Sequence, residues 1–207
     1  MDRLPSVAIV PAFLLVALAG CSDEPAGGGA AIARVNAVRA PASSAPPESW
    51  CEVAFGAADA PRFELPPLAA DASGQGFPAQ APGRWVWLNL WATWCAPCIR
   101  EMPVLARWKG ELARDGAKVD FWFLTLDEDL SELGRFLREN PGTPPGRQLR
   151  VSSVDVMEPW FVKYKLAAST AIPVQVLVAP GGKVRCLRVG GLNEADYRLV
   201  RGLFDSP

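Results

Sequence analysis

The stretch "NLWATWCAPCIREMP", residues 89–103, constrains the fold more than any other part of the chain. It starts inside an apolar, tryptophan-rich run and continues into a segment whose apolar residues have helical spacing. Cys95 and Cys98 stand where the run gives way to the helix. Such a run is typical of a strand that is covered on both faces, so the cysteine pair is expected at a strand-to-helix junction of an α/β domain.

Strand-like and helix-like patterns alternate through residues 84–204. The predicted strands are 84–91, 117–127, 173–179 and 183–189, and the predicted helices are 96–116, 129–140, 158–166 and 193–204. Gly116 ends the first helix, Asn193 caps the last, and "PGG" at 180–182 predicts a hairpin turn. The order β-α-β-α, then a hairpin and a helix, indicates a mixed central sheet with helices on its faces.

The first 20 residues predict a signal peptide. A single arginine precedes the apolar run "LPSVAIVPAFLLVALAG", which ends in small residues before Cys21. "LAGC" resembles the bacterial lipobox, whose cysteine is lipidated and becomes the mature N-terminus, so Cys21 is expected to carry a membrane lipid anchor. A plain secretory signal and a retained membrane helix are the alternatives. In each case the mature protein is expected outside the cytoplasm.

Two further parts follow the signal peptide. Residues 21–48 are rich in Gly, Pro and small side chains, which predicts a flexible, lipidated tether. Residues 49–207 contain the recurring apolar segments and form the predicted folded domain.

The composition narrows the chemistry that is open to the chain. The 21 Lys and Arg residues nearly cancel the 22 Asp and Glu residues, and no basic run is present, which argues against a nucleic-acid partner. The chain has no histidine, so imidazole is absent as a metal ligand and as a general base. Flavin and nicotinamide motifs are absent as well, and no cofactor is expected. Thiols and carboxylates are left to carry the chemistry.

The expected place of Cys95 at a helix N-terminus favours its thiolate. Unpaired N–H groups and the helix dipole stabilise negative charge there, and the pKa of a CxxC cysteine in this position falls to about 7. Cys98 lies one turn later, within reach of the first sulfur. Pro97 suits the first turn because its missing N–H is not needed. The spacing therefore predicts a nucleophile and a second thiol that resolves its mixed disulfide.

Two other uses of the pair compete with thiol exchange. A zinc site needs about four ligands, and Cys51 and Cys186 complete one only if the fold brings all four thiols together, so no metal is predicted. A purely structural Cys95–Cys98 disulfide closes a very small loop and adds little stability.

The motifs "WATWCAPC", "EMP" and, about 75 residues later, "AIP" resemble the thioredoxin superfamily. More narrowly, the chain resembles the membrane-tethered thiol–disulfide oxidoreductases of the bacterial envelope, the TlpA and ResA type, from about Ala60 to Leu203. Within this match, "APRFELPPL" (60–68) resembles the lead-in strand of that group, and "APGGKV" (179–184) resembles its hairpin turn. The resemblance implies a thioredoxin-like fold with an N-terminal lead-in strand.

The resemblance also implies roles for individual residues. Cys95 is the attacking, more exposed cysteine, and Cys98 is the buried, resolving one. Pro173 matches the cis-proline that faces the disulfide and presents backbone to an extended substrate. The alternative for Pro173 is an ordinary proline at the start of a strand. The chain departs from the group around this position, with Ile172 before the proline and Val174-Gln175 after it.

Glu101 is the candidate for proton transfer. Thioredoxins bury an aspartate six residues before the first cysteine, where this chain has Asn89, whereas Glu101 matches a carboxylate that ResA-type proteins place near the active site. Helical spacing puts it on the same face as Cys98, and a partly buried carboxyl there has a raised pKa and accepts the thiol proton. The alternative is a solvated glutamate paired with Arg100 or Arg107.

Cys51 and Cys186 remain after the other cysteines are assigned. In an oxidising compartment an even remaining pair is more often bridged than free, so a structural Cys51–Cys186 disulfide is predicted. Two separate buried thiols are the alternative.

These observations together predict a periplasmic, lipid-anchored protein disulfide reductase. Its substrates are expected to be protein disulfides, and the resemblance suggests apocytochrome c and copper-site assembly proteins. A membrane thiol carrier is expected to supply the electrons. The same fold used as a dithiol oxidase is one alternative, and a non-catalytic envelope binding protein whose CxxC holds a metal or a loop is the other.

Overall fold

The computed structural model describes residues 45–69 and 79–205. The expected signal peptide, the lipidation site Cys21 and most of the tether lie outside these residues. The elements in chain order are η1 (Pro47–Trp50), β1 (Val53–Ala54), β2 (Trp85–Trp91), α1 (Ala96–Arg114), β3 (Val119–Thr125), α2 (Leu130–Glu139), β4 (Arg147–Arg150), η2 (Val154–Val156), α3 (Met157–Lys163), β5 (Val174–Ala179), β6 (Lys183–Val189), η3 (Glu194–Asp196) and α4 (Tyr197–Leu203). Among the described helices, none has the length and apolar character needed to span a bilayer.

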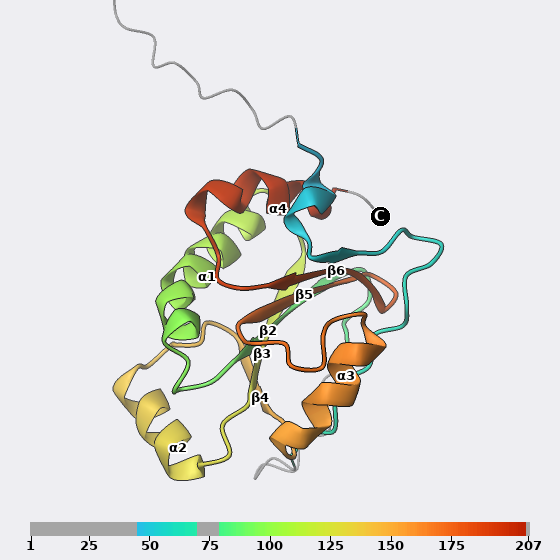
Figure 1. The fold of residues 1–207 in the computed structure, drawn as a ribbon. Helices are drawn as coiled ribbons and strands as arrows, with labels where there is room; N and C mark the ends of the chain where they lie inside the picture. The colour runs from blue at the N-terminus through green and yellow to red at the C-terminus, as the bar shows by residue number, and fades with distance from the viewer. Residues whose placement is uncertain (1–44, 70–78, 206–207) are drawn as a thin grey trace, which may run out of the picture. The chain divides into compact units, whose positions relative to one another are not determined.

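One six-stranded mixed sheet organises the domain (Figure 1). Its strand order is β1-β6-β5-β2-β3-β4. The β2–β3 and β3–β4 pairs are parallel, and the β2–β5, β5–β6 and β1–β6 pairs are antiparallel. This arrangement confirms the α/β, thioredoxin-like fold that the sequence predicts, with β2 near the centre and the CxxC segment directly after it.

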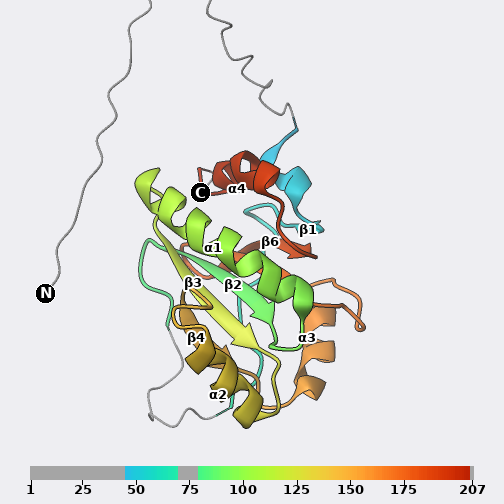
Figure 2. The ribbon, with the colours of Figure 1, turned by 90° about the vertical axis from the view of Figure 1, so that its left-hand side faces the viewer.

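The central strand β2 is covered on both faces, as its apolar run predicts. All seven of its residues are buried. Figures 1 and 2 show α1, α2 and α4 on one side of the sheet and α3 on the other. On the first side, Trp87 contacts Trp108 of α1, and Trp91 contacts Phe136 of α2. Alternate side chains of a strand point to opposite faces, so Asn89, between these two tryptophans, also faces α1.

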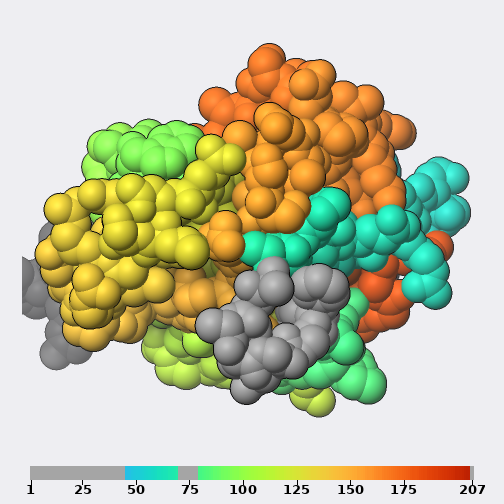
Figure 3. All heavy atoms as spheres, turned by 90° about the horizontal axis from the view of Figure 1, so that it is seen from below, coloured from blue at the N-terminus to red at the C-terminus, as the bar shows by residue number. Residues whose placement is uncertain are grey.

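The lead-in to the sheet differs from the prediction. The short strand β1 pairs with β6 through Val53 and Ala54, whereas residues 60–68 form only two isolated bridges, Arg62 with Lys183 and Leu68 with Val151. Three prolines in 60–68 lack the N–H that a continuous ladder needs. The segment instead packs beside α3, as the space-filling view from below shows, and Glu64 O accepts a hydrogen bond from Trp160 Nε1 (Figure 3).

The edge strand β4 has no counterpart among the predicted elements. It pairs with β3 in parallel after a turn that contains Gly146. A Cβ atom at Gly146 would lie 2.4 Å from the carbonyl oxygen of Phe121, so only glycine fits where this turn meets β3. The other predicted strands and helices are present, with ends that shift by a few residues.

Candidate active site

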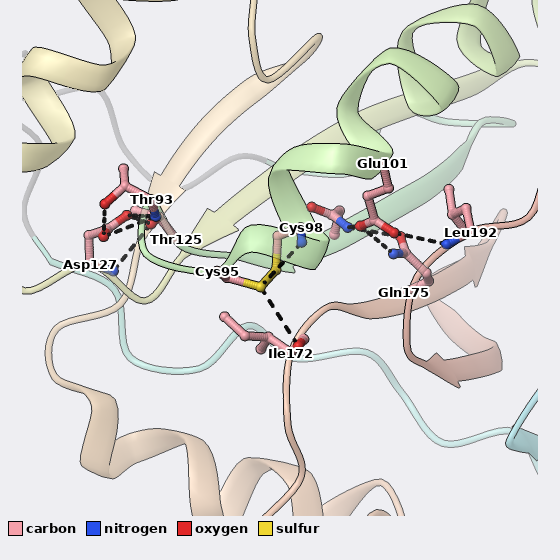
Figure 4. The surroundings of a disulfide bond; sticks show 10 residues. Thr93, Cys95, Cys98, Glu101, Thr125, Asp127, Ile172, Gln175 and Leu192 are labelled. Atoms are coloured by element: carbon pink, nitrogen blue, oxygen red, sulfur yellow. Dashed lines mark hydrogen bonds between the residues drawn. A yellow bond between two sulfur atoms is a disulfide. The ribbon is translucent and has the colours of Figure 1, made fainter.

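Cys95 and Cys98 form a disulfide at the start of α1 (Figure 4). Cys95 is the N-cap residue, and the N–H of Cys98 donates to its Sγ over 3.3 Å. Pro97 lies in the first helical turn, where no N–H is required. The helix N-terminus thus directs an N–H group at the Cys95 sulfur, which stabilises a thiolate once the bond is reduced.

The two cysteines differ in access. Cys95 is 5% exposed, whereas Cys98 is fully buried. The residue next to the pair, Trp94, is 67% exposed, which is unusual for so large an apolar side chain. An incoming disulfide therefore reaches Cys95 before Cys98.

The segment directly before β5 brings backbone to the disulfide. The Ile172–Pro173 peptide bond is cis, and the carbonyl oxygen of Ile172 lies 3.7 Å from Cys95 Sγ (Figure 4). Pro173 therefore has the position beside the cysteine pair that the resemblance implies for it, and Ile172 presents the neighbouring polar backbone atom.

Glu101 points into the interior between α1 and the sheet (Figure 4). It is only 3% exposed. Its Oε1 accepts hydrogen bonds from Asn89 Nδ2 (2.7 Å) and Gln175 Nε2 (2.9 Å), and its Oε2 accepts one from the N–H of Leu192 (3.1 Å). Burial raises the pKa of Glu101 to about 7, although the three N–H donors oppose the rise. A carboxyl that titrates near neutrality, one helical turn from Cys98, is suited to proton transfer.

The solvated alternative for Glu101 is wrong. Arg107 forms its ion pair with Glu194, and Arg100 is exposed on the outer side of α1. Neither arginine is a hydrogen-bond partner of the buried carboxyl.

A groove of about 470 Å³ runs from Trp94 along α2. Its walls combine apolar and charged side chains, mostly acidic, among them Phe136, Asp127, Glu132 and Arg135. Asp127 is buried at the inner end, where both of its carboxylate oxygens accept from the N–H of Thr93. This bonding fixes the backbone two residues before Cys95 and so steadies the approach to the disulfide.

The second disulfide joins Cys51 and Cys186, the pair that the sequence analysis selects. Its Cα atoms are 5.4 Å apart, and 135 positions separate the two cysteines in the chain. Next to it, Arg188 Nη1 donates to the carbonyl oxygen of Trp50, and its guanidinium lies over the indole ring at 5.4 Å. These contacts attach the segment before β1 to β6. The four cysteines of the described residues thus form two disulfides. The same residues contain no group of three or more His, Cys, Asp or Glu positioned to hold a metal ion.

Sequence reasoning missed the partners of Glu101. Gln175 stands in an otherwise apolar strand, "PVQVLVA", and a polar residue in such a run is the one signal that a buried hydrogen bond was needed. Leu192 contributes through its backbone N–H, for which no sequence signal exists. Asp127, the last residue of the predicted strand 117–127, lies just beyond β3 and gives no sequence signal for its bond to Thr93.

Comparisons with known proteins agree with this geometry. A family model described as the AhpC/TSA family matches residues 57–132. The thioredoxin-like protein YneN of Bacillus subtilis (strain 168) is 35% identical over 77 residues, which cover 37% of this chain and 44% of YneN. The chain therefore spans less than half of the length of that curated relative.

A solved structure extends the similarity beyond the CxxC segment. The thioredoxin-related protein from Neisseria meningitidis serogroup B superposes with a TM-score of 0.50 at 26% identity, over 64% of this chain and 93% of that one. Together these findings support the thioredoxin superfamily for this chain.

Proposed function

We propose that this chain is a thiol–disulfide oxidoreductase of the TlpA and ResA type that acts as a protein disulfide reductase in the bacterial envelope. The observation that carries the proposal is the Cys95–Cys98 disulfide at the N-terminus of α1, with an N–H group directed at Cys95 Sγ and the Ile172 carbonyl beside it. Glu101, buried behind the pair, supplies a proton acceptor.

The reaction has two exchange steps. The Cys95 thiolate attacks one sulfur of a partner disulfide, which forms a mixed disulfide and releases the other partner sulfur as a thiolate. Cys98 then loses its proton, with Glu101 as the acceptor, and its thiolate attacks Cys95 Sγ. The Cys95–Cys98 disulfide forms and the second partner sulfur leaves as a thiolate, so the partner gains two electrons and the dithiol loses two.

An insulin-reduction assay with dithiothreitol tests the exchange chemistry. We expect the chain to accelerate insulin precipitation and Cys95→Ser to lower the rate to that of dithiothreitol alone, because the attacking sulfur is gone. Val162→Ala, at an exposed position on α3, is the control and should keep its activity. Full activity in Cys95→Ser would contradict the nucleophile assignment, and stoichiometric zinc in the purified chain would favour a binding protein.

Equilibration with glutathione tests the direction. For a reductase we expect a potential below about −200 mV, toward the thioredoxin end of the scale. A value near about −120 mV would identify a dithiol oxidase instead.

The envelope location is part of the proposal and rests on the sequence before the described domain. We expect Cys21→Ser to block processing and labelling by radioactive palmitate, because the lipidated residue is lost. A wild-type protein that is processed without label would be a plain secreted protein. The electron donor is a membrane thiol carrier, and apocytochrome c or copper-site assembly proteins are the candidate substrates.

A further inference from the structure

The two amides that hold Glu101 are themselves held by a tryptophan. Asn89 of β2 and Gln175 of β5 stand directly opposite one another in the antiparallel ladder, and both side chains are fully buried. Asn89 Nδ2 donates to Gln175 Oε1 over 3.0 Å, and Trp87 Nε1 donates to the same Gln175 oxygen over 2.8 Å. The chain of hydrogen bonds therefore runs from Trp87 through Gln175 and Asn89 to Glu101.

Among Trp87, Gln175 and Asn89, only Trp87 has a side chain whose hydrogen-bond direction is fixed. The amide of Asn or Gln can turn by half a rotation and exchange its donor end for its acceptor end, whereas an indole N–H can only donate. Because Trp87 donates to Gln175 Oε1, the Nε2 group of Gln175 is directed toward Glu101. The same Gln175 oxygen requires a donor from Asn89, which fixes the second amide as well.

A reversed Gln175 amide would place its Nε2 group against the Trp87 N–H, 2.8 Å away, and its oxygen against Glu101 Oε1, 2.9 Å away. The first contact joins two donors and the second joins two acceptors while the carboxyl is ionised. Once Glu101 is protonated, its O–H group needs a hydrogen-bond acceptor, and a reversed amide offers its oxygen. The Trp87 N–H therefore opposes the very arrangement that suits the protonated acid.

We propose that Trp87 is a positioning residue for the dithiol: its indole N–H sets both amides so that they donate to Glu101 and keep the carboxylate available for the Cys98 proton. This rests on the proposed function, in which Glu101 accepts that proton. It assigns a role in the reaction to a residue that lies in the aromatic core, stacked on Phe121.

Among the residues that the structure describes, the groups that face Glu101 are uncharged. From β2 and β5 they are the two amides, and from the segment after β6 they are the Leu192 N–H and Gly191, which has no side chain and whose added Cβ would lie 3.9 Å from Oε2. The titratable neighbour on its own helix is Cys98, one turn away. The orientation of the two amides is accordingly the main feature of the surroundings that sets how tightly Glu101 holds its proton.

The test is the pKa of Glu101 in the full chain, read from the carboxyl ¹³C signal that Glu101→Gln removes. With Trp87→Phe we expect the pKa to rise by about one unit, a tenfold decrease in the acid dissociation constant, because the amides are free to reverse. The pH midpoint of insulin reduction should move in the same direction. An unchanged pKa would overturn the proposal.

Two controls separate orientation from packing. Trp85→Phe makes the same substitution on the same face of β2 and should leave the pKa unchanged; an equal rise in that variant would also overturn the proposal. If Trp87→Phe does not fold, 3-benzothienylalanine at position 87 keeps the indole shape with sulfur in place of the N–H and should give the same rise.

A double-variant cycle gives the sharpest outcome. Gln175→Leu removes the hydrogen-bonded connection between Trp87 and Glu101. In that background, adding Trp87→Phe should produce no further rise in the pKa of Glu101, whereas an effect of altered packing would raise this pKa further. The carboxyl signal is read without turnover. A chain that fails to reduce insulin but shows these pKa changes would contradict the proposed function alone, and the reverse result would contradict this inference alone.

Discussion

The two disulfides of this domain are the same covalent bond in two opposite settings. Cys95 and Cys98 are 3 positions apart, whereas Cys51 and Cys186 are 135 positions apart. The first begins a helix, beside the exposed Trp94 and a groove. The second joins the segment before β1 to a fully buried residue of β6. The setting decides whether the bond constrains the chain or is available for exchange.

The chain-entropy model gives the two disulfides different contributions to the free energy of folding. Closing a loop of 135 residues stabilises the folded state by about 5 kcal/mol, whereas closing one of three residues gives about 2 kcal/mol. The larger value belongs to the bond that joins two distant segments of the chain, Cys51 before β1 and Cys186 in β6. The bond that must open in every cycle contributes less than half as much, so the fold loses less stability when that bond is reduced.

The largest expected effect is on stability. Replacing the outer pair, with Cys51→Ala and Cys186→Ala, should lower the free energy of unfolding by about 5 kcal/mol, measured by urea denaturation under oxidising conditions. Replacing the inner pair, with Cys95→Ala and Cys98→Ala, is the control and should cost about 2 kcal/mol. Equal losses for the two pairs would remove the distinction between a structural and an exchanging disulfide.

A difference of at least about tenfold in ease of reduction is the second expectation. A structural disulfide has a potential below about −300 mV, which is at least about 30 mV under a thioredoxin-like value of about −270 mV, and each 30 mV is about a tenfold change. Of the four cysteines other than Cys21, thiol counting in a mild reductant should therefore find two free in the native chain and all four free after denaturation. Four thiols in the native chain at the same reductant concentration would show that both bonds are accessible.

The region around the Cys95–Cys98 disulfide is more predictable from the sequence than the region around the Cys51–Cys186 disulfide. Its strand, turn and helix follow one another in the chain, and the signals for each are local: an apolar run, a cysteine N-cap and Pro97. The hairpin of β5 and β6 was predictable for the same reason, because its turn residues lie between its strands.

Elements that depend on distant contacts were harder to predict. The strand β4, "RQLR", is short and charged, and only its pairing with β3 makes it a strand. The resemblance of residues 60–68 to a lead-in strand predicts a strand there, but prolines reduce its ladder to two bridges. In the site, the position of Glu101 followed from helical spacing, whereas its bond to Gln175 depends on the β2–β5 register.

Glu101 should make the free energy of unfolding of the domain depend on pH. Its pKa is about 7 in the folded chain and about 4.3 when unfolded, so the folded state binds the proton more tightly. The resulting stabilisation is complete below about pH 4 and is lost as the pH rises through 7. Relative to Glu101→Gln, the free energy of unfolding should fall by about 3 kcal/mol between pH 4 and pH 8.

Urea denaturation across this pH range measures the difference, and Glu158→Gln, at an exposed position on α3, is the matched control. A Glu101→Gln variant that follows the wild-type pH profile would show that the buried carboxyl does not titrate in this range.

The smallest expected effect concerns Trp94, which distinguishes the surroundings of the exchanging bond from those of the structural one. Its side chain is 67% exposed beside Cys95 and borders the groove, so it offers an apolar contact to a partner polypeptide at little cost to the fold. Trp94→Ala should lower kcat/KM for insulin about tenfold, equivalent to about 1.4 kcal/mol, mainly through KM because the chemistry of Cys95 is unchanged. Val162→Ala, at a 57% exposed position on α3 that does not line the groove, should leave kcat/KM unchanged. The free energy of unfolding should change by less than about 0.5 kcal/mol in both variants, because neither side chain is packed. If Trp94→Ala instead lowers kcat with KM constant, Trp94 influences the reacting sulfur itself and is not a docking contact.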